Sequence, residues 1–175
     1  MKNFTRMNKN FTNSEFIQYG VNTEMDKLVN SEDYNVRAEV AKQGYGLDRL
    51  INDESEYVRR VVVRQGYGLD KLVNDKDWYV RAAVAKQGYG LDKLINDESY
   101  RVRAAVAEQG YDLDNLINDK DWYVRATVAS KGYGLDKLAN DKNYYVREYA
   151  CYYLEENNIT LYEWKEKYPE KVAGK

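Results

Sequence analysis

Few residues in this chain could carry out chemistry, and most of them belong to a repeated pattern. The sequence has no histidine and a single cysteine, Cys151, so it offers no imidazole base and no cysteine set for zinc or an iron–sulfur cluster. No carboxylate pair stands outside the pattern as a candidate acid and base. We therefore predict a protein that is not an enzyme and that carries no cofactor.

Regularly spaced aspartates are the residues that most suggest a metal site. They are Asp26, Asp48, Asp70, Asp92, Asp114 and Asp136. Each stands two residues before a leucine, at the expected first turn of a short helix, where the helix dipole favours a carboxylate. No acidic loop with calcium-binding spacing accompanies them. We predict that they bind no metal.

Arginines that directly follow a valine suggest either a row of phosphate-binding groups or a structural role. They are Arg37, Arg59, Arg81, Arg103, Arg125 and Arg147. An aspartate precedes five of them by six residues, as Asp75 precedes Arg81. An arginine at the edge of an apolar face is normally paired. We favour the structural role and leave these arginines out of the predicted binding site.

Aromatic residues are the strongest candidates for a binding surface, because 18 of the residues are tyrosines. One row follows a set of glycines and is expected to pack (Tyr45, Tyr67, Tyr89, Tyr111 and Tyr133). A second row stands at the expected first position of the longer helices (Tyr34, Trp78, Tyr100, Trp122 and Tyr144). The second row either packs between repeats or forms an exposed strip that binds a partner.

Other positions on the same outward helix face vary along the chain. One row reads Ala38, Arg60, Ala82, Ala104, Ala126 and Glu148, and another reads Lys42, Arg64, Lys86, Glu108, Ser130 and Tyr152. The first half is therefore basic (Lys42, Arg60, Arg64 and Lys86), and the second half is acidic or neutral. The basic half, with Arg59 and with Trp78 as a stacking plane, is an alternative site for nucleic acid. The net charge of -2 counts against that alternative.

The elements that must position these residues come from a repeat of 22 residues, the spacing from Val36 to Val58. The valine-arginine pair occurs six times, from Val36 to Val146, and each unit can bury its apolar face only against its neighbours. The spacing of Val80, Ala83 and Val84 predicts a helix of about ten residues in each repeat. A leucine-rich stretch such as GLDKLVND leaves room for one short α or 3₁₀ helix, with Leu69, Leu72 and Val73 pointing inward.

Helix start and stop signals agree with this division of the repeat. Three residues before each valine stands an N-capping residue (Asp33, Ser55, Asp77, Ser99, Asp121 and Asn143). Glycines supply the left-handed stop (Gly44, Gly66, Gly88, Gly110 and Gly132). We expect an N-terminal cap over 1–22 with Thr12 and Glu15 as a capping box, an array over 23–154, and a capping helix and tail over 155–175, which Thr160 and Glu163 open.

The stretch from Asp75 to Ala85, DKDWYVRAAVA, with Leu69 and Leu72, resembles the leucine-rich repeat variant family, and its Asp-x4-Val-Arg core is similar to HEAT repeats. The resemblance covers about residues 20–154. It implies an all-α, right-handed α-solenoid of six repeats, in which Asp–Arg pairs join neighbours. A unit of 22 residues is too short for the two full helices of a HEAT repeat, so the variant with one reduced helix is favoured.

The function that these features favour is non-enzymatic binding of another protein or an extended peptide along the outward helix face. The resemblance implies the same class, scaffolding and binding. The abundance of Asn, Lys and Tyr suggests an AT-rich genome, and a further alternative is a phage or mobile-element inhibitor of a host defence protein, similar to an anti-CRISPR. The first residues lack the apolar run of a signal peptide, and no stretch approaches a membrane span, so we expect a cytoplasmic protein without membrane contact.

Overall fold

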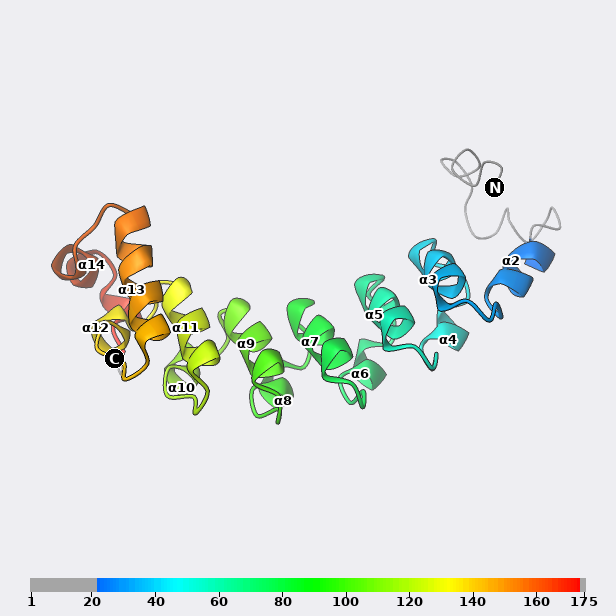
Figure 1. Ribbon diagram of the computed structural model, residues 1–175, viewed down its shortest axis with the longest axis horizontal. Coiled ribbons are helices and arrows are strands. Elements are labelled where there is room, and N and C mark those ends of the chain that lie inside the picture. Colours follow the sequence, from blue (N-terminus) through cyan, green and yellow to red (C-terminus); the bar gives the residue numbers. More distant parts are fainter. Residues whose placement is uncertain (1–21, 174–175) are drawn as a thin grey trace. The chain divides into compact units, whose positions relative to one another are not determined.

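The computed structural model describes residues 22–173, and over this range every regular element, from α2 to η2, is a helix (Figure 1). The helices pack in a regular manner that is consistent with a helical repeat. The chain divides into two compact units, Met1–Tyr67 and Gly68–Lys175. This boundary falls inside the region 23–154 that the sequence predicts as one array. The predicted capping box of Thr12 and Glu15 lies outside the described residues.

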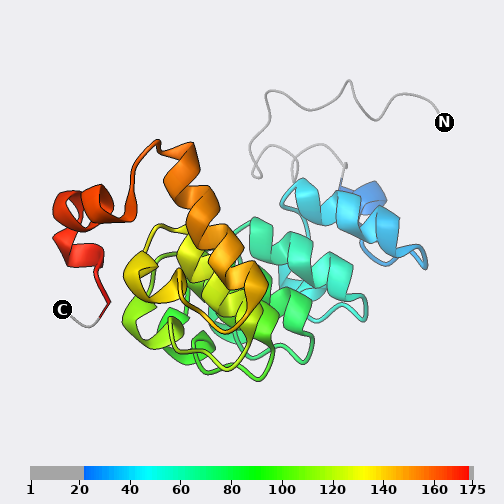
Figure 2. The same ribbon diagram turned by 60° about the vertical axis from the view of Figure 1, so that its left-hand side comes forward.

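Each repeat supplies one longer helix, as the sequence predicts. In the first unit these are α3 (Tyr34–Lys42) and α5 (Glu56–Arg64), which contact each other. In the second unit α7 (Trp78–Lys86), α9 (Tyr100–Glu108), α11 (Trp122–Ser130) and α13 (Tyr144–Glu156) contact one another in that order (Figure 2). The helices have 9 residues except α13, which has 13. Helix α13 is longer because no stop glycine follows it.

The shorter elements alternate with the longer helices. They are α2 (Asn22–Leu28) and the four-residue helices α4 (Leu47–Leu50), α6 (Leu69–Leu72), α8 (Leu91–Leu94), α10 (Leu113–Leu116) and α12 (Leu135–Leu138). Leu72 and Val73 are buried as expected, whereas Leu69 is only half-buried. The short helices therefore contribute their last leucine and the residue after it to the core.

The predicted helix ends are confirmed in position and mostly in detail. The side chains of Asp33, Asp77, Asp121 and Asn143 accept a hydrogen bond from the amide two residues later. Ser55 and Ser99 occupy the N-cap position without such a bond, so that part of the prediction is wrong. Their own amides instead donate to Asp53 and Asp97, each at 2.9 Å. The five stop glycines all have positive φ, for example +74° at Gly88.

One predicted outward row is mostly part of the core. Ala38, Ala82, Ala104 and Ala126 are at most 8% exposed. The longer helices contact their neighbours within each unit, and a methyl group at this position is too short to reach solvent past the adjoining helix. Only Glu148 of that row is exposed, and Arg60 is half-buried.

The C-terminal segment folds back on the last short helix. Helix α14 (Leu161–Lys167) begins with the predicted capping box of Thr160 and Glu163 and is followed by the 3₁₀ helix η2 (Pro169–Lys171). Helix α14 contacts α12, its Trp164 is fully buried, and the amide of Gly134 donates to the carbonyl of Lys171 at 2.8 Å. The segment therefore covers an apolar face that has no further repeat beyond it.

Candidate partner-binding surface

Aromatic rings on α9, α11 and α13 form a continuous series of contacts. The rings of Tyr100 and Tyr123 lie 5.8 Å apart, and Tyr123 lies 5.8 Å from Trp122. Trp122 lies 5.1 Å from Tyr145, which in turn lies 5.6 Å from Tyr144. Several pairs are close to edge-to-face, the geometry that aromatic quadrupoles favour.

An arginine continues this series toward α7. The guanidinium carbon of Arg101 lies 4.6 Å from the ring centroid of Tyr100 and 4.7 Å from that of Trp78. Trp78 stacks on Tyr79 with a centroid distance of 3.6 Å. We call the set Trp78, Tyr79, Tyr100, Trp122, Tyr123, Tyr144 and Tyr145 the aromatic strip. All its members belong to the second unit.

The aromatic strip both packs between helices and faces solvent. Trp122 is 37% exposed and Tyr144 is 60% exposed, although each contacts a ring on its own or a neighbouring helix. Trp78 and Tyr100 are half-buried, with Arg101 over their faces. The two readings that the sequence left open are therefore combined within one surface, and its accessible part is on α11 and α13.

Half of the aromatic strip was not predicted. Tyr79, Tyr123 and Tyr145 are each at least 41% exposed and stand directly before the valine-arginine pair. They reach back across the helix contact, because Tyr123 and Tyr145 each contact a ring of the preceding longer helix. The recurrence of tyrosine before Val80, Val124 and Val146 was the signal in the sequence that could have identified them.

In the first unit, the same two positions form an isolated aromatic pair. Tyr34, which is 46% exposed, lies 6.1 Å from Tyr57 at an interplanar angle of 82°. The equivalent first helical position of α5 is Glu56, so the row lacks an aromatic residue there.

The predicted basic residues do not all present free charge. Lys42 pairs with Glu39 at 2.6 Å, and Lys86 pairs with Glu108 at 3.1 Å. The pKa of Lys42 is raised, chiefly by its hydrogen bond to Glu39. Arg64 is exposed and Arg60 is half-buried. Lys42, Arg60 and Arg64 belong to the first unit and Lys86 to the second.

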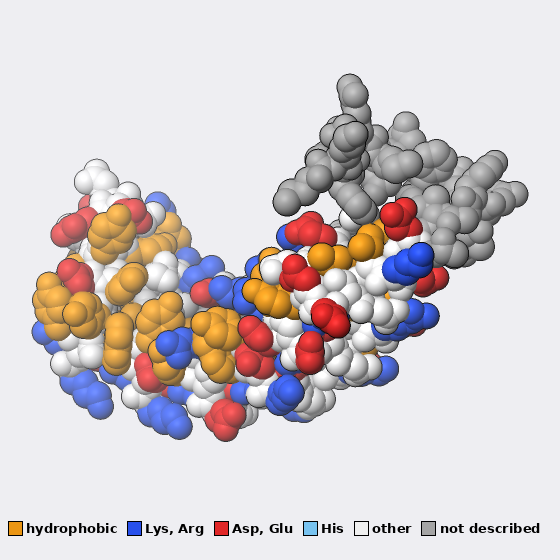
Figure 3. Space-filling model, turned by 45° about the vertical axis from the view of Figure 1, so that its right-hand side comes forward, with side chains coloured by type: hydrophobic (Ala, Val, Ile, Leu, Met, Phe, Trp, Pro, Cys, Tyr) orange, Lys and Arg blue, Asp and Glu red, His pale blue; other side chains and the backbone are white. Residues whose placement is uncertain are grey.

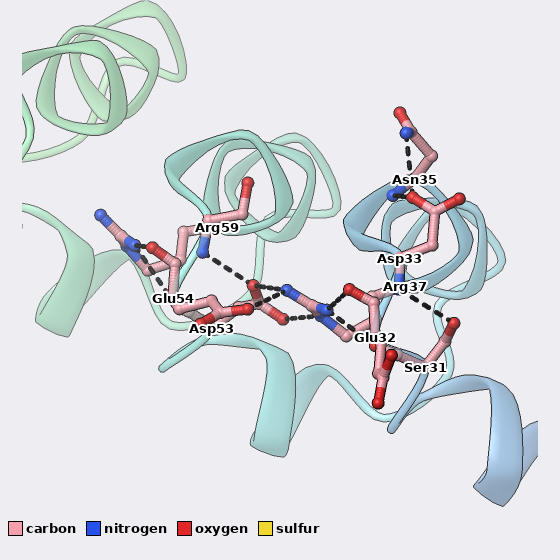
Figure 4. A network of polar contacts seen from close by, with 9 residues as sticks. Ser31, Glu32, Asp33, Asn35, Arg37, Asp53, Glu54 and Arg59 are labelled. Atoms are coloured by element: carbon pink, nitrogen blue, oxygen red, sulfur yellow. Dashed lines mark hydrogen bonds and ion pairs between the residues drawn. The ribbon is translucent and has the colours of Figure 1, made fainter.

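The arginines after the valines have the structural role that the sequence predicts, with a different partner. Arg37 donates from Nε to Asp53 at 2.6 Å, and from Nη1 to the carbonyl of Ser31 at 2.7 Å (Figure 4). The carboxylate thus comes from the following repeat, whereas the residue six positions earlier contributes its backbone. The same arrangement recurs at Arg81 with Asp97, Arg103 with Asp119 and Arg125 with Asp141.

These ion pairs are buried and mutually stabilising. Arg103 and Asp119 have side chains that are 6% and 8% exposed. Burial alone would raise the pKa of Asp119, but hydrogen bonds from Arg103 and from the amide of Asp121 lower it overall. A paired and buried guanidinium is not available to phosphate, which supports leaving these arginines out of the site.

The regularly spaced aspartates accept hydrogen bonds from the tyrosines that follow the stop glycines. The hydroxyl of Tyr45 donates to Asp26 at 2.8 Å, and that of Tyr133 donates to Asp114 at 2.6 Å. Burial together with Asp114 raises the pKa of Tyr133 to about 12. Within residues 22–173 no group of three or more acidic or cysteine side chains is placed to hold a metal ion.

Two further observations bear on the class of protein. None of the helices described between residues 22 and 173 has the length and apolar character needed to cross a bilayer. No protein-family model matches this chain, and neither a curated protein nor a solved structure shows significant similarity to it.

Proposed function

We propose that the 22-residue unit builds a right-handed α-solenoid of six repeats, each with one longer and one reduced helix, and that this array is a non-enzymatic module for binding another protein. The near-identical bounds of α3, α5, α7, α9 and α11 support the repeat. The repeated Arg–Asp pairs support direct stacking of neighbours, as the resemblance to leucine-rich repeat variants implies.

The accessible aromatic strip is the observation that carries the binding proposal. Exposed Tyr and Trp are enriched in protein interfaces, because each ring buries a large area at little cost in conformational entropy. Trp122, Tyr123, Tyr144 and Tyr145 are all at least 37% exposed and lie on two adjoining helices. Contacts between the rings fix their positions before a partner arrives, which lowers the entropic cost of binding.

Nucleic acid is a less well supported partner. Lys42 and Lys86 are already paired with glutamates, and exposed carboxylates accompany the rings on α13. A phosphate backbone would meet partly neutralised charge at the basic residues and repulsion at the acidic ones. We therefore keep protein binding as the proposed function and make nucleic acid an outcome of its test.

Affinity capture from a bacterial lysate, with and without nuclease, tests the proposal. The variant to compare with the native chain is Trp122→Ala with Tyr144→Ala. A matched control is Tyr89→Ala with Tyr111→Ala, because these tyrosines are 41% and 39% exposed but lie outside the aromatic strip. Circular dichroism checks that all three proteins are folded.

The proposal predicts a protein that survives nuclease treatment and is lost only with the strip variant. Capture that disappears after nuclease treatment and weakens steeply with salt would replace protein by nucleic acid as the partner. Equal capture by the native chain and both variants would show that the aromatic strip is not the binding surface.

A further inference from the structure

The outward face of α13 combines aromatic rings with carboxylates. Tyr144, Tyr145, Tyr149 and Tyr152 are between 45% and 60% exposed. Glu148, which lies between them in the helix, is exposed and accepts a hydrogen bond from the hydroxyl of Tyr144 at 3.2 Å. Glu155 and Glu156 are also exposed, one turn further along. Figure 3 shows hydrophobic and acidic side chains side by side on its left-hand part.

Positive charge is nearly absent from this face. The only basic residues within α11 and α13 are Arg125 and Arg147. Arg125 is buried against Asp141, and Arg147 is half-buried and donates to the carbonyl of Asp141 at 2.7 Å. The nearest lysines, Lys120, Lys131 and Lys142, lie outside both helices in the chain. The exposed carboxylates on α13 therefore lack a cationic partner on either helix, apart from hydrogen bonds with neighbouring tyrosines.

The second unit already contains an example of what these rings can hold. Arg101 places its guanidinium between Trp78 and Tyr100, less than 5 Å from either centroid. The equivalent position on α11 and α13 is a tyrosine, Tyr123 or Tyr145. No arginine of this chain thus occupies the strip beyond Tyr100, except that Arg147 lies 5.9 Å from Tyr144 among the described residues.

We propose that the α11–α13 face binds arginine side chains of a basic, extended segment in the protein partner, an inference that rests on the proposed function. Rings supply cation–π contacts to the planar guanidinium, and Glu148, Glu155 and Glu156 supply charge complementarity. Arginine is preferred to lysine, because its flat group stacks on a ring while its edges donate to carboxylates.

Spacing between the helices indicates the pattern of the segment. Neighbouring packed helices lie about 8–10 Å apart, and an extended chain advances about 3.1–3.3 Å per residue. An arginine at about every third position would therefore meet successive helices. A peptide with four Arg-Gly-Ser units is a direct probe of this pattern, with Lys-Gly-Ser and Glu-Gly-Ser peptides of equal length as comparisons.

Fluorescence anisotropy of the labelled peptides with the full chain tests the inference. The arginine peptide should bind about tenfold more tightly than the lysine peptide, and the glutamate peptide should not bind. Tyr144→Ala should weaken the arginine peptide about fivefold, and Glu148→Gln, which preserves shape, should weaken it about threefold. Tyr89→Ala should leave the affinity unchanged.

Equal affinity for the arginine and lysine peptides would overturn the inference, as would indifference to both α13 substitutions. Failure of every peptide, with a captured protein still lost from the Trp122→Ala and Tyr144→Ala variant, would overturn the inference and leave the proposed function standing. Failure of both experiments would overturn the two together.

Discussion

At the scale of single residues, the arginine that follows each valine holds together segments that are far apart in the repeat. Arg103 joins the carboxylate of Asp119 to the carbonyl of Asp97, at 2.7 Å and 2.8 Å. Removal of one partner from a buried pair leaves an uncompensated charge, which costs more than the pair itself contributes. These arginines are therefore expected to be sensitive positions for stability.

Arg103→Ala should lower the free energy of unfolding by about 3–5 kcal/mol, because it leaves Asp119 buried without its cation. Arg101→Ala, on the same helix, removes an exposed arginine and should cost about 1 kcal/mol or less. Urea unfolding followed by circular dichroism compares the two. Losses of similar size would contradict the structural role of the buried pair.

The same pairs predict how stability depends on pH. In the folded chain the pKa of Asp141 is lowered, first by its hydrogen bond with Arg125, and that of Asp119 is lowered overall. A depressed folded pKa gives stability that is present above the unfolded value, about 3.9, and is lost as pH falls through the folded value.

The urea midpoint should therefore decline below about pH 4. In Asp141→Asn, which lacks one of these carboxylates, the midpoint should be lower near neutral pH and its decline in acid should be shallower. A native chain whose midpoint is constant down to about pH 2 would contradict this account of the ion pairs.

At the scale of elements, turn glycines separate the longer from the shorter helices, and two kinds can be distinguished. Gly88 has φ of +74° and open space where a Cβ would stand. Gly90 has φ of +62°, and a Cβ there would lie 2.6 Å from Cγ2 of Val73. Asp112 takes the equivalent place in another repeat at φ of 44°, which shows that the backbone conformation itself admits a side chain.

Gly88→Ala should cost about 1–2 kcal/mol, the strain of an L-residue in the left-handed region. Gly90→Ala should cost about 1–3 kcal/mol more, because Val73 must also move. Thermal and urea unfolding of the two variants measure the difference. A smaller loss for Gly90→Ala than for Gly88→Ala would contradict the packing described at the short helices.

Local signals in the sequence predicted the helices but not their mutual contacts. Cap residues and glycines act within a few positions of the chain, so the starts of α7 and α11 are predicted correctly at Trp78 and Trp122. Ala82 was placed on the outward face because a single helix does not reveal where its neighbour lies. Tyr123 was overlooked for the same reason, since its ring contacts Tyr100 on another helix.

At the scale of the whole molecule, the proposed solenoid predicts tolerance to a change in repeat number. Each repeat in such an array contacts its neighbours alone, so stability is approximately a sum over repeats and their interfaces. A second copy of residues 78–99 inserted after Ser99 should fold, and the urea m-value should rise in proportion to the added surface. A closed globular core would instead lose cooperative unfolding on this insertion.

The central claim is that the exposed aromatic strip binds a protein partner, and the most direct test is the affinity of the purified captured partner, measured by calorimetry. The native chain and the Tyr89→Ala, Tyr111→Ala control should bind equally, whereas Trp122→Ala with Tyr144→Ala should weaken binding at least about thirtyfold, as expected for interface anchors. Equal dissociation constants for all three folded proteins would contradict the account.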